Sequence, residues 1–419
     1  MPFTSSQPTR GPYFVVPGVP QRRQFALCAA GLERRFNPWE DAALVEPEAR
    51  VTENEAIKTA FHEVTAAHGG SHVEDGGWMW LEGFGDVAKE YAALRDDVAV
   101  WDVSPLNKWE FRGPDALRGA QRVFSNDALG LGVGQVRYGA FLDADGLMVD
   151  DGTVFNTALD DHCWVMTNSG DHKEHFADEL KDLDAEFEWI TLSMPHLGVI
   201  GPRSREVVQK LTDEDIGPLR YFRFIPRPIR VAGVGVHLSR TGYGGELGYE
   251  LFLRDPGDAE TLWNAVLGAG VTPIGTDAIE VARVEAGLIV TGYDYEPHER
   301  TPFDFNLDRM VRIDQELGFA GEEALRAVTA DKPNRFVTLR FEADTLPEYG
   351  AAVTKDGDEV GVLTSPTNSP RFGQIGLAVV TSEQASVGNT LGVAVGDAIV
   401  PATVDVLPIY DTEKKRPRA

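Results

Sequence analysis

Cysteine is almost absent from this chain of 419 residues, which contains only Cys28 and Cys163. Two cysteines cannot form a disulfide framework or a metal site of four thiolates, so the sequence predicts a protein of a reducing compartment. No apolar run reaches about 18 residues, and no positively charged segment followed by an apolar one opens the chain. We therefore expect neither a membrane span nor a secretory signal, and a cytoplasmic location.

Positive charge is scarce as well. The 39 lysines and arginines stand against 66 aspartates and glutamates, which gives a formal net charge of -27. Long-range repulsion of this kind opposes nonspecific binding to nucleic acid or to an anionic membrane. We expect no partner of either class, and an anionic ligand would need a locally basic pocket.

Hydrophobic residues, in contrast, make up 42% of the chain, which allows a large core spread over about two to three domains. Residues 1–51 show no sustained periodicity and predict an N-terminal extension. Single helices then alternate with antiparallel strands, which is typical of an α+β fold. After about residue 335 only strands follow, joined by glycine-rich turns, so we expect a small all-β barrel or sandwich there.

The stretch TGYGGELGYE, residues 241–250, places two glutamates among four glycines. Each glycine costs a helix roughly 1 kcal/mol relative to alanine, so the stretch predicts a glycine-rich turn or a bulged strand. If the segment after residue 245 is extended, Glu246 and Glu250 share one face. A tight surface hairpin with solvated acids is the alternative.

A second acidic pair, Asp150 and Asp151, follows a hairpin predicted around the turn at residues 143–146. Alternation along a strand sends one carboxylate to each face, so one of them should point into the protein. A buried carboxylate near a cofactor would have a raised pKa and could transfer a proton. Exposed hairpin acids are again the alternative.

Two further groups of residues could serve a ligand. His172 and His175 could share a metal ion, but no third ligand is evident, and a solvated helix face explains them as well. Tryptophans could line a pocket for an apolar or cationic group, although this residue type more often belongs to the core. The tryptophans concerned are Trp78, Trp80, Trp101 and Trp109.

Five segments, in this order, resemble the tetrahydrofolate-dependent aminomethyltransferase family, which comprises the glycine-cleavage T-protein and its relatives. They are RDDVAVWDVSPLNKWEFRGPDA, GLMVDDGTVF, HLGVIGPRS, TGYGGELGYE with VARVEAGL, and GFAGEEAL followed by TSPTNSPRFGQIGLAVV. The resemblance implies a three-domain cloverleaf in which two α+β domains and a C-terminal β-barrel surround a central folate channel. The first domain would comprise residues 52–100 and 190–305, the second 101–189, and a linker with the barrel 306–419.

The resemblance also implies roles for individual residues. Asp151 matches the catalytic aspartate, which would orient tetrahydrofolate and handle the proton on its N5 atom. Glu250 matches the glutamate that binds the pterin. The remaining expected cofactor-binding residues are Tyr243 beside the ring, Tyr138 in the pocket, Glu246 in a supporting role and Arg283 in the R-x-E-A-G helix. Trp78 and Trp80 match the N-terminal pocket region and would contact the substrate.

Departures from the family pattern bear on the reaction. The chain has Ile279-Glu280 where glycine-cleavage members have an Arg-Asp pair, and Phe155 where a tyrosine is usual. These differences favour a branch that moves a methyl group from a small methylated S-, N- or O-compound to tetrahydrofolate. The alternatives are the aminomethyltransferase of glycine cleavage, which needs a carrier protein, a folate-binding accessory protein of iron–sulfur cluster repair, and a subunit that partners a flavin-dependent amine oxidase.

Overall fold

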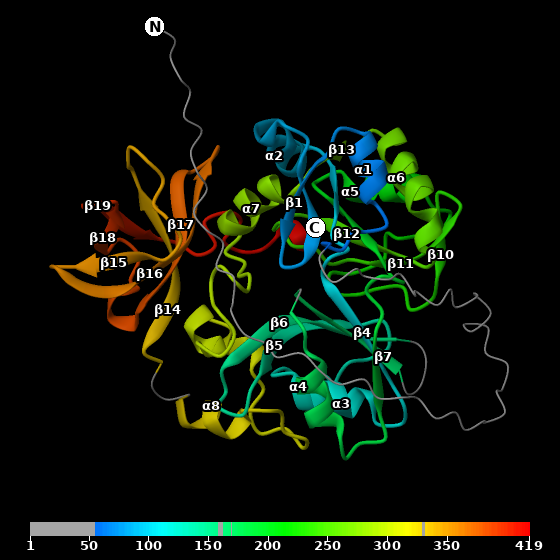
Figure 1. Cartoon of the computed structure of the whole chain (residues 1–419), viewed down its shortest axis with the longest axis horizontal. Helices are drawn as coiled ribbons and strands as arrows, with labels where there is room; N and C mark the ends of the chain where they lie inside the picture. The colour runs from blue at the N-terminus through cyan, green and yellow to red at the C-terminus, as the bar shows by residue number, and fades with distance from the viewer. Residues whose placement is uncertain (1–54, 158–161, 169, 329–331) are drawn as a thin grey trace, which may run out of the picture. The chain divides into compact units, whose positions relative to one another are not determined.

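The computed structural model describes residues 55–157, 162–168, 170–328 and 332–419 (Figure 1). The predicted extension at residues 1–51 lies outside this part of the chain. The described residues form eight α-helices and four β-sheets, one of which closes into a barrel.

A six-stranded sheet carries the end of the glycine-rich motif on strand β12. All neighbouring strands pair antiparallel except β13, which runs parallel to β3. Leu251 and Leu253 of β12 pack with helix α6 through Trp263 in one core, so alternation sends Glu250 and Phe252 to the opposite face. In spatial order the strands are β10 (Ile229–Val231), β11 (Val234–Ser239), β12 (Gly248–Leu253), β9 (His196–Ile200), β3 (Ala99–Asp102) and β13 (Thr272–Pro273).

A five-stranded antiparallel sheet carries the acidic pair. The predicted hairpin is present, because β5 and β6 pair around a turn in which Gly146 has a φ of 76°. Phe176 and Leu180 of helix α4 pack with Val154 on one face of this sheet. In spatial order the strands are β5 (Val136–Leu142), β6 (Met148–Asn156), β7 (His162–Thr167), β4 (Asn107–Arg112) and β8 (Glu186–Trp189). The covering helices are α3 (Ala116–Val123) and α4 (Lys173–Leu180).

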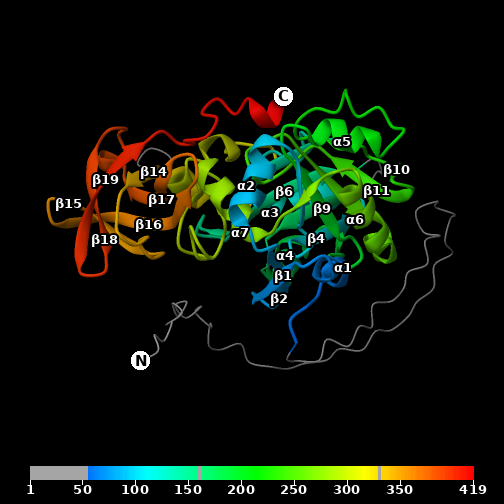
Figure 2. The same ribbon diagram turned by 90° about the horizontal axis from the view of Figure 1, so that it is seen from above.

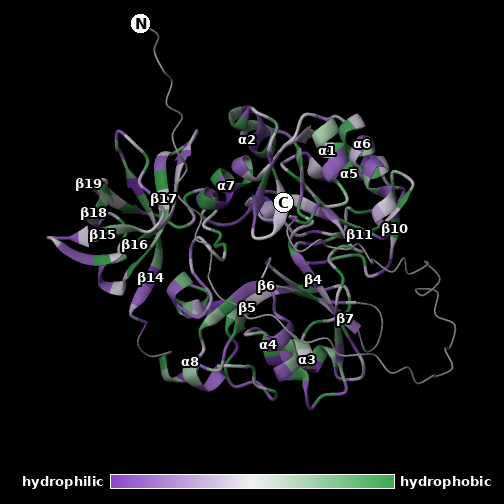
Figure 3. Ribbon diagram, in the orientation of Figure 1, coloured by the Kyte–Doolittle hydropathy of each residue, from purple (hydrophilic) through white to green (hydrophobic). Residues whose placement is uncertain are grey.

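Six antiparallel strands close into the C-terminal barrel, which leaves no open sheet edge. These strands mix hydrophilic and hydrophobic residues (Figure 3). In the last of them, Ala402 and Val404 are buried whereas Pro401 and Thr403 are exposed, as expected when one side of a strand lies in a core. Around the barrel the strands are β14 (Asn334–Phe341), β17 (Gly373–Thr381), β16 (Asp358–Ser369), β15 (Ala351–Lys355), β18 (Thr390–Val395) and β19 (Ala398–Asp405).

The remaining elements connect these sheets. They are the hairpin of β1 (Ser71–Asp75) and β2 (Trp78–Gly83), and the helices α1 (His62–Ala67), α2 (Val87–Asp96), α5 (Ser204–Lys210), α6 (Ala259–Gly268), α7 (Thr276–Glu285) and α8 (Glu322–Val328). Short 3-10 turns occur at Pro256–Asp258, Pro302–Phe305, Asp308–Met310, Ser382–Gln384 and Arg416–Arg418. Helix α7 packs against both α2 and β16 of the barrel. After β19 the chain returns to α5, where Arg205 donates a 2.6 Å hydrogen bond to the carbonyl of Ala419 (Figure 2).

The predicted α+β class and the C-terminal barrel are confirmed. The domain boundaries and the central folate channel stay predictions. Among the helices of the described residues, none has both the length and the apolar character needed to cross a bilayer.

Candidate functional site

The acidic pair of strand β6 is buried on both faces of the five-stranded sheet. Asp150 is 1% exposed and Asp151 is 7% exposed. Only one of them was expected to point inward, but helix α4 covers the other face of the sheet. His172, directly before α4, lies with Nε2 2.6 Å from Oδ2 of Asp150. Neither carboxylate is therefore a solvated hairpin acid.

Two tyrosine hydroxyls hold the Asp151 carboxyl group. Tyr138 of β5 donates to Oδ2 at 2.8 Å, and Tyr295 donates to Oδ1 at 2.6 Å. Burial and then the negative charge of Asp150 raise the pKa of Asp151 to about 7, while the two hydrogen bonds oppose this shift. Asp151 is thus balanced between its acid and base forms near neutral pH.

Tyr243, from the glycine-rich motif, adds a third aromatic side chain. Its hydroxyl donates to the carbonyl of Ile289 at 2.7 Å. Burial raises the pKa of Tyr243 well above its ordinary value, and the charge of Asp151 acts in the same direction. The charge of Tyr243 likewise contributes to the raised pKa of Tyr138, after burial and Asp151. The structure therefore gathers Tyr138, Tyr243 and Asp151, three of the sequence-predicted residues, within electrostatic range of one another.

Glu250 lies in a row of residues that crosses four strands of the six-stranded sheet. In spatial order the row consists of Trp101 (β3), Gly198 (β9), Glu250 (β12) and Ser239 (β11). A Cβ atom at position 198 would lie 2.4 Å from Nε1 of Trp101, so the glycine makes room for the indole beside Glu250. The row therefore combines a carboxylate with a flat aromatic side chain.

The Glu250 carboxylate is also bonded by hydroxyl groups. Thr241 donates to Oε2, and Ser239 donates to the same oxygen at 3.4 Å. Burial raises the pKa of Glu250, and the Thr241 hydrogen bond and the charge of Lys108 oppose the shift. Lys108 is fully buried and donates to two backbone carbonyls at 2.9 and 2.8 Å. Burial lowers the pKa of this lysine to about 7, so its compensating charge is weak.

His196 is a neutral neighbour of the same carboxylate. It is 2% exposed, its Nε2 lies 4.0 Å from Oε1 of Glu250, and its ring stacks on Phe252 with a centroid distance of 4.6 Å. Burial lowers the pKa of His196 well below its ordinary value. Among the described residues, none is a hydrogen-bond partner of its buried Nδ1. Because buried polar atoms are normally satisfied, this nitrogen marks a place for a polar ligand atom or water.

The two acids face the same layer between the two sheets. Asp151 and Phe155 share one face of β6, and Glu250 and Phe252 share one face of β12, by strand alternation. The rings of Phe155 and Phe252 touch edge to face with centroids 5.8 Å apart. At about 3.3 Å per residue, the acids lie roughly 13 Å and 7 Å along their strands from this contact.

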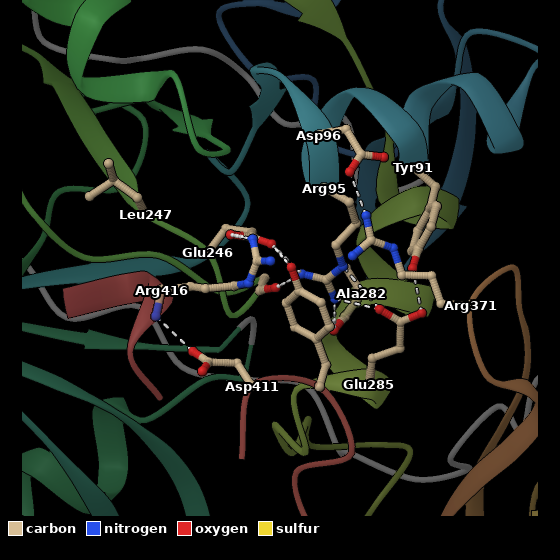
Figure 4. A network of polar contacts seen from close by, with 12 residues as sticks. Tyr91, Arg95, Asp96, Glu246, Leu247, Ala282, Glu285, Arg371, Asp411 and Arg416 are labelled. Carbon is tan, nitrogen blue, oxygen red and sulfur yellow. Dashed lines mark hydrogen bonds and ion pairs between the residues drawn. The ribbon is translucent and has the colours of Figure 1, made fainter. Parts of the chain in front are cut away.

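Glu246 belongs to a different cluster (Figure 4). The chain bends at residues 243–247 and Gly245 has a φ of 73°, so the extended conformation that would align Glu246 with Glu250 does not form. Glu246 is 3% exposed, accepts a hydrogen bond from the Tyr410 hydroxyl and lies 3.5 Å from Arg95. This cluster holds the glycine-rich loop in place.

Arg283 of helix α7 is fully buried, and all its donors are used within the protein. It donates two hydrogen bonds to Glu280 on the same helix, one to Asp294 at 2.7 Å and one to the Ser365 hydroxyl of the barrel at 2.7 Å. A fifth N–H points to the carbonyl of Leu288 at 3.3 Å. Asp294 directly precedes Tyr295. Arg283 therefore stabilises the loop from which Tyr295 donates its hydrogen bond to Asp151.

The tryptophans of hairpin β1–β2 lie in separate surroundings. Trp78 is 4% exposed and its ring is 6.4 Å from that of Trp189. Trp80 is partly buried and donates from Nε1 to the carbonyl of Asp75 at 3.2 Å. Their contact with a substrate stays a prediction. His172 is engaged with Asp150, and within the described residues no group of three or more His, Cys, Asp or Glu side chains is arranged to hold a metal ion.

Three residues of the site carry little signal in the sequence. Tyr295 lies at the end of a turn without periodicity, and only the fold brings it to Asp151. His196 begins the fully buried strand β9, and Lys108 is a buried residue of β4 next to Trp109. A polar residue beside apolar ones at a strand position is the clue that could have identified them.

Comparison with known proteins identifies the family. Residues 61–315 match the GCVT N-terminal domain, and residues 334–411 match the glycine cleavage T-protein C-terminal barrel domain. The chain belongs to the glycine cleavage T-protein family. It is similar to the aminomethyltransferase of Listeria welshimeri, with 30% identity over 86% of this chain and 99% of that protein. It is also similar to a probable aminomethyltransferase of Halobacterium salinarum, with 34% identity over 82% of this chain and 96% of that protein.

Glycine cleavage T-protein structures share the fold. The crystal structure of the glycine cleavage system aminomethyltransferase T from Bartonella henselae superimposes with a TM-score of 0.78 and 21% identity, over 85% of this chain and 99% of that one. Membership of the glycine cleavage T-protein family identifies the chain as an enzyme that transfers one-carbon groups.

Proposed function

We propose that this enzyme moves a methyl group from a small methylated S-, N- or O-compound to N5 of tetrahydrofolate. The observation that carries the proposal is the pair of buried acids with raised pKa, Asp151 and Glu250, which face one layer from two different sheets. Hydroxyl groups rather than arginine or lysine side chains hold both carboxylates.

The surroundings of Glu250 fit the edge of a reduced pterin. That edge presents an amino group and a ring N–H side by side, and one carboxylate can accept both hydrogen bonds. The hydroxyls of Thr241 and Ser239 both bond to Oε2, which leaves Oε1 for a ligand. Trp101 offers a flat surface beside the carboxylate, and Nδ1 of His196 offers a further polar contact.

Asp151 fits the role of a residue that orients the reacting centre and holds a proton. When bound, tetrahydrofolate supplies the N5 atom that takes up the one-carbon unit. Asp151 in its base form can accept a proton near neutral pH, and its pKa of about 7 suits this task. Tyr138 and Tyr295 fix the direction of its oxygens, and alignment of this kind contributes strongly to transfer rates.

A methyl donor is preferred over the aminomethyl donor of glycine cleavage because of helix α7. Ile279 occupies the position at which glycine-cleavage members have an arginine. The residue is 4% exposed and belongs to an apolar core. Its neighbour Glu280 pairs with Arg283. Aminomethyl transfer, with a carrier protein as partner, is the second candidate, because the relatives are named aminomethyltransferases. Copurification with a flavoprotein would instead point to a subunit of an amine oxidase.

The test is incubation of the purified protein with tetrahydrofolate and a panel of methylated sulfonium, amine and methoxy compounds. Mass spectrometry would then distinguish 5-methyl- from 5,10-methylene-tetrahydrofolate. Formation of the 5-methyl product, lost in Asp151→Asn, supports the proposal. Formation of the methylene product from an aminomethyl carrier alone would instead establish the second candidate.

A further inference from the structure

Asp150 is bonded in a way that suits a fixed carboxylate rather than a reacting one. Its Oδ1 accepts hydrogen bonds from the backbone N–H of Asp151 at 2.8 Å and from Nδ2 of Asn168 at 2.6 Å. Its Oδ2 accepts from the backbone N–H of Asn168 at 3.0 Å and faces Nε2 of His172 at 2.6 Å. An ionised carboxylate offers about four acceptor positions, so those of Asp150 are filled.

Asn168, directly after β7, connects Asp150 to Asp151. Besides its bond to Asp150, its Nδ2 lies 3.2 Å from the carbonyl oxygen of Asp151 and 3.5 Å from Oδ1 of the same residue. The backbone N–H of Asp151 is itself bound by Asp150. A displacement of the Asp150 carboxylate therefore moves both the backbone of Asp151 and a donor near its side chain.

His172 fixes the Asp150 carboxylate from the helix side. It is 6% exposed and its ring lies 5.7 Å from that of Phe176 in α4. His175, within α4, has an equivalent ring contact with Phe176 at 5.9 Å, but no group in the described part of the chain bonds to its buried Nε2. Burial, followed by the charge of His172, lowers the pKa of His175 to about 4, while Asp143 and His298 also act on it.

We propose that Asp150 and His172 form a positioning pair that fixes the Asp151 carboxylate through Asn168. The inference rests on the proposed function, because positioning of Asp151 affects the reaction only if Asp151 takes part in the transfer. Neither member of the pair contacts substrate or cofactor in this role. Both act through Asp151.

The first experiment compares three variants for kcat and for the Kd of tetrahydrofolate. Since misplacement of a reacting group by about 1 Å can cost 100-fold, we expect His172→Phe to lower kcat by about 10- to 100-fold. The Kd should stay within about threefold, because Glu250 is untouched. His172→Gln retains an N–H donor and should recover most of the rate, and the matched control His175→Phe should keep the wild-type rate. An equal loss in His172→Phe and His175→Phe, or no recovery in His172→Gln, would overturn the proposal.

The second experiment needs no substrate. Infrared titration of the ligand-free protein follows the protonated Asp151 carboxyl, which is assigned by its absence in Asp151→Asn. We expect a midpoint near pH 7 in the wild type and in His175→Phe. In Asp150→Asn the neighbouring negative charge is gone, so the midpoint should fall by about 1 to 2 pH units. An unchanged or higher midpoint contradicts the coupling.

The two experiments separate this inference from the proposed function. If the wild-type protein transfers no one-carbon unit to tetrahydrofolate from any donor, the proposed function fails, whatever the variants do. If the wild type is active but the Asp151 midpoint and the kcat values do not respond as described, the positioning pair alone is wrong.

Discussion

Glu246 and Glu250 lie four residues apart in one motif, and both carboxylates are largely buried, yet they differ in what surrounds them. Glu246 joins a network in which Arg95 bonds to Glu285 at 2.7 and 3.0 Å, so each negative charge there has a cation close by. Glu250, like Asp151 across the layer, is held mainly by hydroxyl groups. Matched charges hold the fold together, whereas unmatched buried carboxylates stay ready for a ligand or a proton.

The strongest test of the comparison is Asp151→Asn. The substitution keeps the shape of the side chain but removes the carboxylate, so we expect kcat for transfer to fall by about 1,000-fold or more. Folding should persist, because no cation loses its partner. Circular dichroism and single-turnover kinetics measure the two effects, and an Asp151→Asn enzyme that turns over at the wild-type rate would remove this residue from the mechanism.

Glu285→Ala tests the other side of the comparison. It leaves the fully buried Arg95 without its principal partner, and loss of one member of a buried pair costs about 3–5 kcal/mol of unfolding free energy. The exposed Glu206, which pairs with Arg203 and Lys210, provides the matched control Glu206→Ala, which should change the unfolding free energy far less because exposed ion pairs contribute little to stability. Urea denaturation compares them, and equal costs for the two variants would mean that the network is no stronger than a surface ion pair.

Glu250→Gln should weaken binding without destroying the fold. The neutral amide lacks the negative charge that strengthens hydrogen bonds from the ligand, at a cost of about 1.5–3 kcal/mol. The Kd for tetrahydrofolate is therefore expected to rise by about 10- to 100-fold, as measured by calorimetry. Unaltered affinity would show that the pterin edge does not lie on this carboxylate.

The smallest effect concerns pH. The pKa of Asp151 is about 7 in the folded protein and about 3.9 in an unfolded chain, so the folded state binds the extra proton between these values. This contribution to the unfolding free energy is fully present below pH 4 and is lost as pH rises to about 7, by at most about 1.4 kcal/mol for each pH unit. Subtracting the pH profile of Asp151→Asn from that of the wild type isolates it. A difference that grows with pH would have the wrong sign.

Much of the architecture follows from local pattern. The turn at Asp143 to Gly146 between alternating strands predicts the β5–β6 hairpin, and strand-only sequence after residue 335 predicts the barrel. Placement of Asp150 and Asp151 on opposite faces follows from the strand period. The burial of Asp150 does not, because it depends on α4 lying over that face.

The composition of the site is less accessible to sequence reasoning. The prediction that Glu246 and Glu250 share one face assumes an extended chain. The chain bends near Gly245, so the two side chains do not share a face. Tyr295 reaches Asp151 across 144 positions of sequence, so its role depends on tertiary structure alone. The orphaned nitrogen of His196 is likewise a property of packing, which no spacing of residues reveals.

The hydroxyl of Tyr410 bonds to Glu246 and so joins a segment made after the last barrel strand to a loop made about 160 residues earlier. During synthesis the glycine-rich loop lacks the hydrogen bond from Tyr410 until the ribosome has translated position 410 and the segment has emerged. We therefore expect nascent chains stalled before this point to bind tetrahydrofolate poorly, even when Asp151 and Glu250, which we propose as its contacts, have already been translated.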